Sequence, residues 1–237
     1  MSDDLVIRRL SAGYGVHAVL REMSLTAEAG KLTALIGPNG HGKTTLLRTI
    51  SGLIRPKEGE IFLGSERISG LSAEAIVARG IIHVPQGDLL FPEMSVLENL
   101  RMGAFLQSAA RQEKTLLEEV YTLLPKLRDR QHQIARTLSG GERRMVGIGR
   151  GLMASGRVLM LDEPSLGLAP IVIEQIYEVI ATLRAVGRSI ILVEENAMRA
   201  AEIADQVHLL DHGTLVWSGT GNELSGRPEL LETYLGV

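Results

Sequence analysis

Short blocks of apolar residues, separated by glycine-rich or charged turns, occupy the first part of the chain and are typical of β-strands. These blocks predict strands at residues 5–10, 19–26, 31–36, 61–63 and 81–84. Residues 44–51 have helical character and follow a glycine-rich segment. The first third of the chain is therefore expected to be mostly β-structure with one early helix.

The pattern changes after about residue 90. Apolar residues fall at helical spacings with charges between them, at Leu100, Leu116, Leu117, Val120, Leu123 and Leu124. We interpret residues 90–155 as a helical subdomain inserted into the domain. Strands are expected again at 158–161 and 189–193, helices at 170–186 and 197–204, and a hairpin of 207–210 with 214–217 that turns at 211–213.

Strands that alternate with helices predict an α/β fold with a mainly parallel sheet, and the length of 237 residues suits one domain spanning 1–237. A net charge of −3 gives no reason to expect nucleic acid as a partner. No cysteine is present, which excludes disulfides and thiol nucleophiles. The acidic start at 1–4 does not resemble a signal peptide, and no apolar run approaches the length of a spanning helix. We therefore expect a cytoplasmic protein that reaches a membrane only through another chain.

A phosphate-binding loop is predicted between the strand at 31–36 and the helix at 44–51. The loop matches the pattern G-x-x-x-x-G-K-[ST], with Gly37, Pro38, Asn39, Gly40, His41, Gly42, Lys43 and Thr44. Glycines let consecutive backbone N–H groups face a phosphate, the lysine neutralises the β- and γ-phosphates, and the threonine hydroxyl binds Mg²⁺. The alternative is an ordinary glycine-rich turn, which the strand–loop–helix context disfavours. His41 occupies a variable position, so we expect a side chain at the loop surface.

Two carboxylates, Asp162 and Glu163, follow the apolar strand at 158–161. Strand alternation points them in different directions, so one can hold the metal while the other faces the attacking water. A helix-capping pair before Pro164 is the alternative interpretation. The phosphate loop upstream favours the catalytic one.

A second glycine motif, Ser139, Gly140, Gly141 and Glu142, follows Leu138 and opens a helix that carries three arginines. Bare N–H groups at a helix start can bind an anion. The same residues also form a capping box, with Ser139 as the N-cap and Glu142 at the third helical position. Taken alone, the motif favours the simple capped helix.

Together these motifs resemble the nucleotide-binding subunit of ABC transporters. The loop at 37–44 is similar to its Walker A motif, 138–142 to its signature, 158–163 to its Walker B motif and Gln86 to its Q-loop glutamine. Residues 163–170 and 192–196 are similar to those of the second ATPase of branched-chain amino acid importers. The resemblance implies a P-loop NTPase core with an antiparallel β-subdomain and an inserted helical subdomain.

The resemblance also implies a role for each motif residue. Tyr14 would stack on adenine, while Lys43, Thr44 and Thr45 would hold phosphates and Mg²⁺. Asp162 and Gln86 would contribute to the metal site, with Glu163 as general base. Ser139 to Glu142 would contact ATP held by an opposite subunit, which explains a second anion site in one chain. For Tyr14, an exposed strand aromatic without a ligand is the alternative.

Two positions depart from the family pattern. Leu168 stands where the D-loop usually ends in Asp, and Glu195 stands where a switch histidine usually closes the γ-phosphate side. An ionised carboxylate repels phosphate, whereas histidine can donate to it. We therefore expect a weakened site in this subunit, with Glu195 protonated, turned away, or bridged to the phosphate by a basic group or a Mg²⁺-bound water.

The function implied is ATP hydrolysis on the cytoplasmic side of a membrane for import of branched-chain amino acids. ATP and Mg²⁺ would be the cofactors. The partners would be transmembrane permease subunits, a sister ATPase or a second copy of this chain, and indirectly a solute-binding protein. The alternatives are import of urea or short amides, a soluble ABC ATPase acting on nucleic acid or ribosomes, and a non-hydrolysing ATP-binding module.

The apolar residues Leu89, Leu90, Phe91 and Met94 predict a contact with the permease, or else packing of the helical subdomain.

Overall fold

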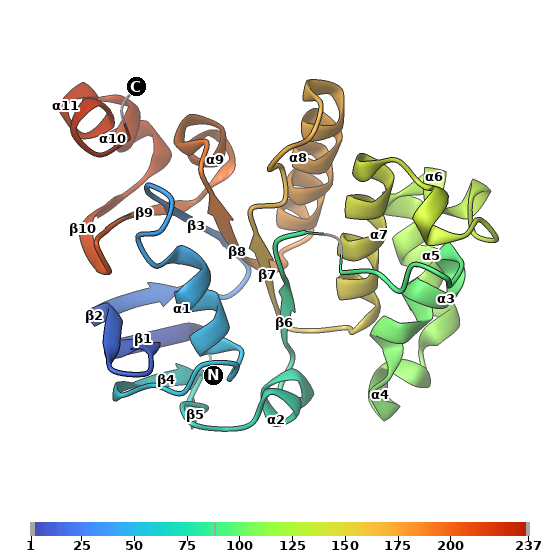
Figure 1. Cartoon of the computed structure of the whole chain (residues 1–237), viewed down its shortest axis with the longest axis horizontal. Coiled ribbons are helices and arrows are strands. Elements are labelled where there is room, and N and C mark those ends of the chain that lie inside the picture. The colour runs from blue at the N-terminus through green and yellow to red at the C-terminus, as the bar shows by residue number, and fades with distance from the viewer. Residues whose placement is uncertain (1–2, 88, 236–237) are drawn as a thin grey trace.

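A computed structural model describes residues 3–87 and 89–235, and Figure 1 shows two sheets with helices around them. Met1 and Ser2, from the acidic start that argued against a signal peptide, lie outside the described residues. The smaller sheet has the order β2-β1-β4-β5, and its paired strands are antiparallel. Its strands are β1 (Leu5–Tyr14), β2 (His17–Ala27), β4 (Glu58–Leu63) and β5 (Glu66–Arg67).

The larger sheet has six strands in the order β10-β9-β3-β8-β7-β6. All its neighbouring pairs are parallel except β9 with β10. The strands are β3 (Leu32–Ile36), β6 (Ile81–Val84), β7 (Val158–Asp162), β8 (Ser189–Glu194), β9 (Gln206–Asp211) and β10 (Thr214–Gly219). The predicted α/β fold class, with a mainly parallel sheet and an antiparallel one, is confirmed.

Helices cover the sheets and form a group between β6 and β7 in the chain (Figure 1). Those around the core are α1 (Lys43–Ile50), α2 (Ala73–Ala78), α8 (Pro170–Ala185), α9 (Ala197–Ile203), α10 (Gly221–Ser225), α11 (Pro228–Leu230) and the π-helix η3 (Leu231–Leu235). The group between β6 and β7 comprises α3 (Val96–Arg101), η1 (Met102–Ala104), α4 (Gln107–Ala110), α5 (Glu113–Leu123), α6 (Pro125–Asp129), η2 (Ala135–Thr137) and α7 (Gly140–Met153). The proposed limits of this subdomain, 90–155, stay a prediction.

Two hydrophobic clusters lie on opposite faces of the six-stranded sheet. On β8, Ile190 and Leu192 belong to the cluster with α7, α8 and α9, whereas Ile191 and Val193 belong to the cluster with α1 and the smaller sheet. This division follows from the two-residue period of a strand. Because both faces are covered, the central strands read as continuous apolar runs. The parallel order also brings the carboxyl ends of β3, β6, β7 and β8 to one edge, where ligands bind in such sheets.

Candidate nucleotide site

The predicted phosphate loop connects the end of β3 to α1, with Pro38, Asn39, Gly40 and His41 in the loop. At Gly37, a Cβ atom would lie 2.2 Å from the Leu210 carbonyl oxygen, so only glycine fits. Gly42 is the N-cap of α1 with φ of 111°, a conformation that favours glycine. Backbone packing against β9 and the helix start therefore fix the shape of the loop.

Lys43 is buried, and its ammonium group is satisfied by the loop itself. Nζ donates to the carbonyl oxygens of Gly37 at 2.8 Å and Pro38 at 3.1 Å, and to Asn39 Oδ1 at 3.4 Å. Glu163 Oε1 lies 3.6 Å from the same nitrogen. This arrangement keeps a cation inside the loop without burying it unpaired, and it leaves the cation where a phosphate would arrive. Thr45 is buried one turn into α1.

Asp162 ends β7 beside the start of α1. Thr44 Oγ1 donates to Asp162 Oδ1 at 3.1 Å, while Oδ2 is buried and has no hydrogen-bond partner among the described residues. Burial raises the pKa of Asp162 to about 6, and the Thr44 hydrogen bond opposes that shift. An unpartnered carboxylate oxygen beside a threonine hydroxyl is the donor chemistry that hard cations such as Mg²⁺ accept.

Glu163 follows immediately and faces different partners from Asp162. Its backbone has φ of 47°, and its N–H donates to the Val193 carbonyl oxygen at 2.9 Å, which prolongs the contact between β7 and β8. Gln86 Nε2, from the segment after β6, donates to Glu163 Oε2 at 2.8 Å. The fold thus brings Lys43, Gln86, Asp162 and Glu163 together, although about 120 residues separate the first from the last.

Glu195 follows β8 and is exposed beside the loop. Asn39 Nδ2 donates to Glu195 Oε1 at 3.0 Å, and Asn39 also accepts from Lys43. A neutral amide of the loop therefore holds the carboxylate, which differs from the basic group or metal-bound water expected from the sequence.

Tyr14 ends β1 and is half exposed, with its hydroxyl accepting from Arg48 Nη1 at 3.1 Å. Its predicted role of stacking on adenine stays a prediction.

His41 lies in the loop and is partly exposed, but its side chain also has a partner that the sequence did not indicate. The imidazole is about one-fifth exposed, and its Nδ1 lies 2.8 Å from Asp211 Oδ1 at the end of β9. The Gly213 N–H also donates to the His41 carbonyl oxygen at 3.0 Å, so the loop and the β9–β10 turn are joined through the backbone as well.

The second glycine motif forms the capping box that the sequence allowed. Ser139 accepts from the Glu142 N–H at 3.3 Å, and Glu142 Oε2 accepts from the Ser139 N–H at 2.8 Å. Figure 1 shows α7 separated from the phosphate loop by β7 and α8. The two motifs therefore do not form one site within a single chain.

The two glycines of this motif differ in their surroundings. A Cβ at Gly141 would lie 2.6 Å from Val172 of α8, so packing within the chain requires glycine there. A Cβ at Gly140 would meet nothing nearer than 3.8 Å. Since helix packing does not explain Gly140, the open space above it is available to something outside the chain.

Three buried polar residues of the site escaped the sequence analysis. His83 Nδ1 pairs with Ser51 Oγ at 3.0 Å behind Asp162, and burial together with Arg48 lowers the His83 pKa to about 4.

Glu194 accepts from the Ser165 N–H at 3.2 Å, and burial raises its pKa. Arg144 Nη1 donates to the Gly87 carbonyl oxygen at 2.8 Å and so ties α7 to the segment after Gln86. The signal available in the sequence for such residues was a polar residue inside or next to an apolar strand, as at His83 and Glu194.

The comparisons with known proteins agree with this geometry. Residues 20–166 match the family model described as ABC transporter. The chain is 40% identical to the high-affinity branched-chain amino acid transport ATP-binding protein BraG of Pseudomonas aeruginosa, over 96% of this chain and 97% of that protein. It is 32% identical to the lipopolysaccharide export system ATP-binding protein LptB of Escherichia coli, over 98% and 97%. A nucleotide-free ATP-binding cassette from an ABC transporter superposes with a TM-score of 0.84 at 26% identity, covering 98% of both chains.

Proposed function

Because this chain belongs to the ABC transporter family, whose ATP-binding proteins hydrolyse ATP to drive transport, we propose that it powers import of branched-chain amino acids or a related small solute. The observation that carries the proposal is the convergence of Lys43, Gln86, Asp162 and Glu163 at one sheet edge, in a chain that matches BraG over nearly its whole length. The predicted catalytic roles of Glu163, Gln86 and Glu195 belong to this proposal.

Each residue has a defined task in the proposed reaction. Lys43 exchanges its contacts with the loop carbonyls for the phosphates of ATP, and the loop N–H groups hold the same phosphates. Thr44 and Asp162 hold Mg²⁺, which supplies positive charge at the phosphates when bound. Glu163 accepts the proton of the attacking water, and Gln86 holds that carboxylate in position.

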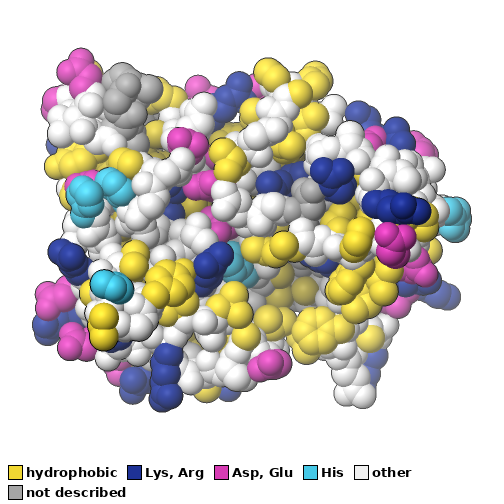
Figure 2. Space-filling view, in the orientation of Figure 1, with side chains coloured by type: hydrophobic (Ala, Val, Ile, Leu, Met, Phe, Trp, Pro, Cys, Tyr) yellow, Lys and Arg dark blue, Asp and Glu magenta, His cyan; other side chains and the backbone are white. Residues whose placement is uncertain are grey.

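The transmembrane partner is proposed to bind a cleft of about 630 Å³ between α1, α2, β6 and the start of the helical group. Exposed apolar side chains line it, namely Leu53, Leu89, Met102 and Phe105. Figure 2 shows hydrophobic side chains gathered across the lower middle of this face. Leu89 thus agrees with the expected permease contact, whereas Leu90 packs against the core. Among the described residues, no helix has the length and apolar character needed to cross a bilayer.

The cleft is tested by Leu89→Asp, which places a charge on a side chain that is 65% exposed. We expect solute uptake to fall more than tenfold while ATP hydrolysis by the isolated subunit stays near wild type, since Leu89 is an exposed apolar side chain with no assigned role in ATP hydrolysis. Val186→Asp, at an equally exposed apolar residue that follows α8, is the matched control and should affect neither activity. Equal loss of both activities in Leu89→Asp would instead support a packing role.

The transported solute is tested in membrane vesicles that contain this chain with the permease and binding protein encoded beside it. We expect ATP-dependent uptake of leucine, isoleucine or valine, and its loss in Glu163→Gln. Uptake of urea or acetamide alone would reassign the solute. Release of a lipid-linked polysaccharide would reassign the direction, the competing assignment suggested by the similarity to LptB.

A further inference from the structure

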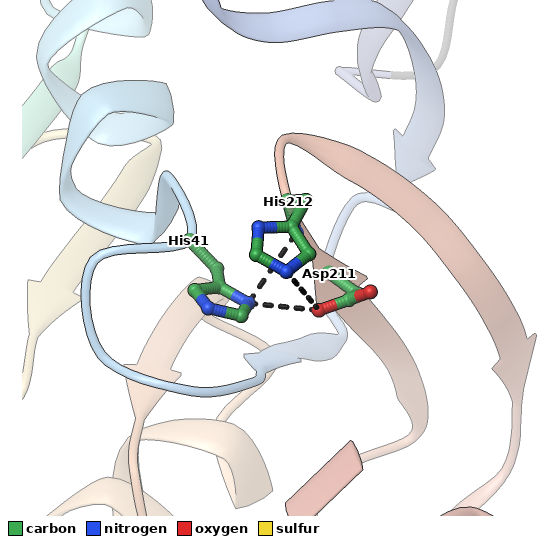
Figure 3. A group of neighbouring side chains, drawn as sticks. All are labelled: His41, Asp211 and His212. Atoms are coloured by element: carbon green, nitrogen blue, oxygen red, sulfur yellow. Dashed lines mark hydrogen bonds and ion pairs between the residues drawn. The ribbon is translucent and has the colours of Figure 1, made fainter. Parts of the chain in front are cut away.

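Two histidines and one aspartate meet at the edge of the phosphate loop, with side chains that have no assigned role toward ATP or Mg²⁺ (Figure 3). His41 comes from the loop, Asp211 from the end of β9 and His212 from the turn before β10. His41 Nδ1 lies 2.8 Å from Asp211 Oδ1, and His212 Nε2 lies 3.9 Å from the same oxygen. The two imidazole rings stack with centroids 4.2 Å apart.

The backbone holds the two halves of the cluster together. His212 and Gly213 both have positive φ, 42° and 81°, and form the two-residue turn of the β9–β10 hairpin. The Gly213 N–H donates to the His41 carbonyl oxygen, and its own carbonyl oxygen accepts from the Arg21 N–H at 2.9 Å. Turns of this type favour Asn, Asp or Gly at the first position, so the backbone conformation alone does not account for a histidine there.

We propose that His41, Asp211 and His212 form a binding site for a divalent transition-metal ion of the zinc class. Two imidazole nitrogens and one carboxylate oxygen are ligands that suit Zn²⁺, Co²⁺ and Ni²⁺, whereas Mg²⁺ and Ca²⁺ prefer oxygen ligands. This ligand set shares no residue with the Mg²⁺ site at Thr44 and Asp162.

The distances allow the site to close once His41 Nδ1 releases the His212 N–H, from which it accepts at 3.3 Å. All candidate ligand atoms lie within 4.8 Å of one another. Ligand atoms lie about 2 Å from zinc, so two ligands of one ion are separated by up to about 4 Å. The His212 side chain is 79% exposed, so its ring can turn toward Asp211 without disturbing the core. The same exposure gives an ion a path from solution and leaves one coordination position for water.

A metal ion here would join the phosphate loop to the β9–β10 hairpin. His41 lies between Gly40 and Gly42, two loop residues with positive φ, and its side chain is the loop's contact with Asp211. An ion that binds only the folded arrangement stabilises it by mass action. We therefore expect metal binding to raise the melting temperature of the nucleotide-free protein.

The test is titration of the full nucleotide-free chain with ZnCl₂ by calorimetry and with CoCl₂ by visible absorption. We expect one ion per chain, the absorption of a tetrahedral Co²⁺ site, and a Zn²⁺-dependent rise in melting temperature. His212→Asn suits the turn and therefore keeps the fold, but it should weaken binding by at least about tenfold, as should Asp211→Asn. His132→Ala removes an exposed histidine from the helical group and should bind as wild type does.

Two results would overturn the site. One is the absence of Zn²⁺ and Co²⁺ binding by the wild-type chain. The other is binding that His212→Asn, Asp211→Asn and His41→Ala all leave unchanged, which would place the ion elsewhere. In either case the cluster would be only a hydrogen-bonded contact between loop and hairpin.

Discussion

At the scale of single residues, the site combines side chains held by their own loop with side chains whose partners lie far away in the sequence. Lys43 is held by the carbonyl oxygens of its own loop, and Glu163 is held by Gln86 from a different strand end. The residue types at Lys43, Asp162 and Glu163 could be identified from local motifs, because their chemistry depends on a fixed spacing. The roles of His41 and Glu194 could not, because each depends on a partner brought near only by the folded sheet.

The two glycines of the second motif provide a matched pair of substitutions. Gly141→Ala forces a methyl group against Val172 and should destabilise the fold by about 1–3 kcal/mol. Gly140→Ala has room for the methyl group, so its melting temperature should match or exceed that of wild type. If ATP of an opposite subunit occupies the space above Gly140, turnover should nevertheless fall more than about tenfold in Gly140→Ala, a loss of about 1.4 kcal/mol. Thermal melts and ATPase assays of both variants decide this, and full activity of Gly140→Ala contradicts a ligand at that position.

At the scale of the elements, the sequence located the long helices and the strands other than β5, but not their ends. The first strand was expected to stop at residue 10, yet β1 continues to Tyr14. Register shifts in its pairing with β2, with positive φ at Arg9 and Glu22, break the alternation while the hydrogen bonding continues. The helical subdomain expected at 90–155 is divided into several short pieces before α7, with η1 containing Gly103 and α6 starting at Pro125. Pro125 is a local signal for a new helix start, whereas the break at Gly103 depends on its close approach to the Arg150 carbonyl oxygen of α7, which local pattern does not reveal.

Strand β9 contains a buried histidine that should make the protein sensitive to acid. His208 pairs with Ser218 Oγ at 2.7 Å, and burial lowers its pKa to about 4 from an ordinary value of 6.5. Above pH 6.5 the residue is neutral in both the folded and unfolded chain. As the pH falls from 6.5 to 4, only the unfolded chain gains a proton there, so the folded state loses up to about 3 kcal/mol.

The substitution His208→Leu removes this titration. We expect its free energy of unfolding to vary less with pH between 4 and 6.5 than that of wild type, by up to the same amount. Urea denaturation at several pH values measures the difference. His132→Ala, which removes an exposed imidazole, is the control and should keep the wild-type pH dependence. Parallel curves for wild type and His208→Leu would show that His208 does not cause the acid sensitivity.

At the scale of the whole molecule, one chain holds two parts of an ATP site, the phosphate loop and the second glycine motif, at separate places. The phosphate loop lies at the edge of the six-stranded sheet, and Ser139 lies at the exposed start of α7 on the other side of α8 (Figure 1). A head-to-tail pair of such chains would bring each Ser139 to the loop of the other. In this arrangement, ATP held by one chain would occupy the open space above Gly140 of the other.

Nucleotide-driven pairing can be tested with Glu163→Gln. Glutamine keeps an oxygen for the Gln86 hydrogen bond but cannot accept the proton of water, so ATP should bind and remain unhydrolysed. We expect this variant to elute as a dimer from size-exclusion chromatography with MgATP, alone or with its sister ATPase, and as a monomer without nucleotide. Adding Lys43→Ala should abolish the dimer. Elution as a monomer under all these conditions would refute the head-to-tail model.

The assembled pair should also be asymmetric if the sister ATPase carries a histidine where this chain has Glu195. Here the carboxylate is held by Asn39 beside the loop and cannot donate a hydrogen bond to a phosphate. Closure of this chain's site should therefore be weak, and most hydrolysis should occur at the sister's site, which Ser139 of this chain completes.

In the assembled complex we expect Glu195→His to raise turnover several-fold, because it adds a donor worth about 1 kcal/mol, and Glu195→Gln to change it less. Substitution of Ser139 should lower turnover far more than either change. Steady-state ATPase rates over a range of pH test this. Unchanged turnover in the Glu195 and the Ser139 variants alike would exclude the asymmetry.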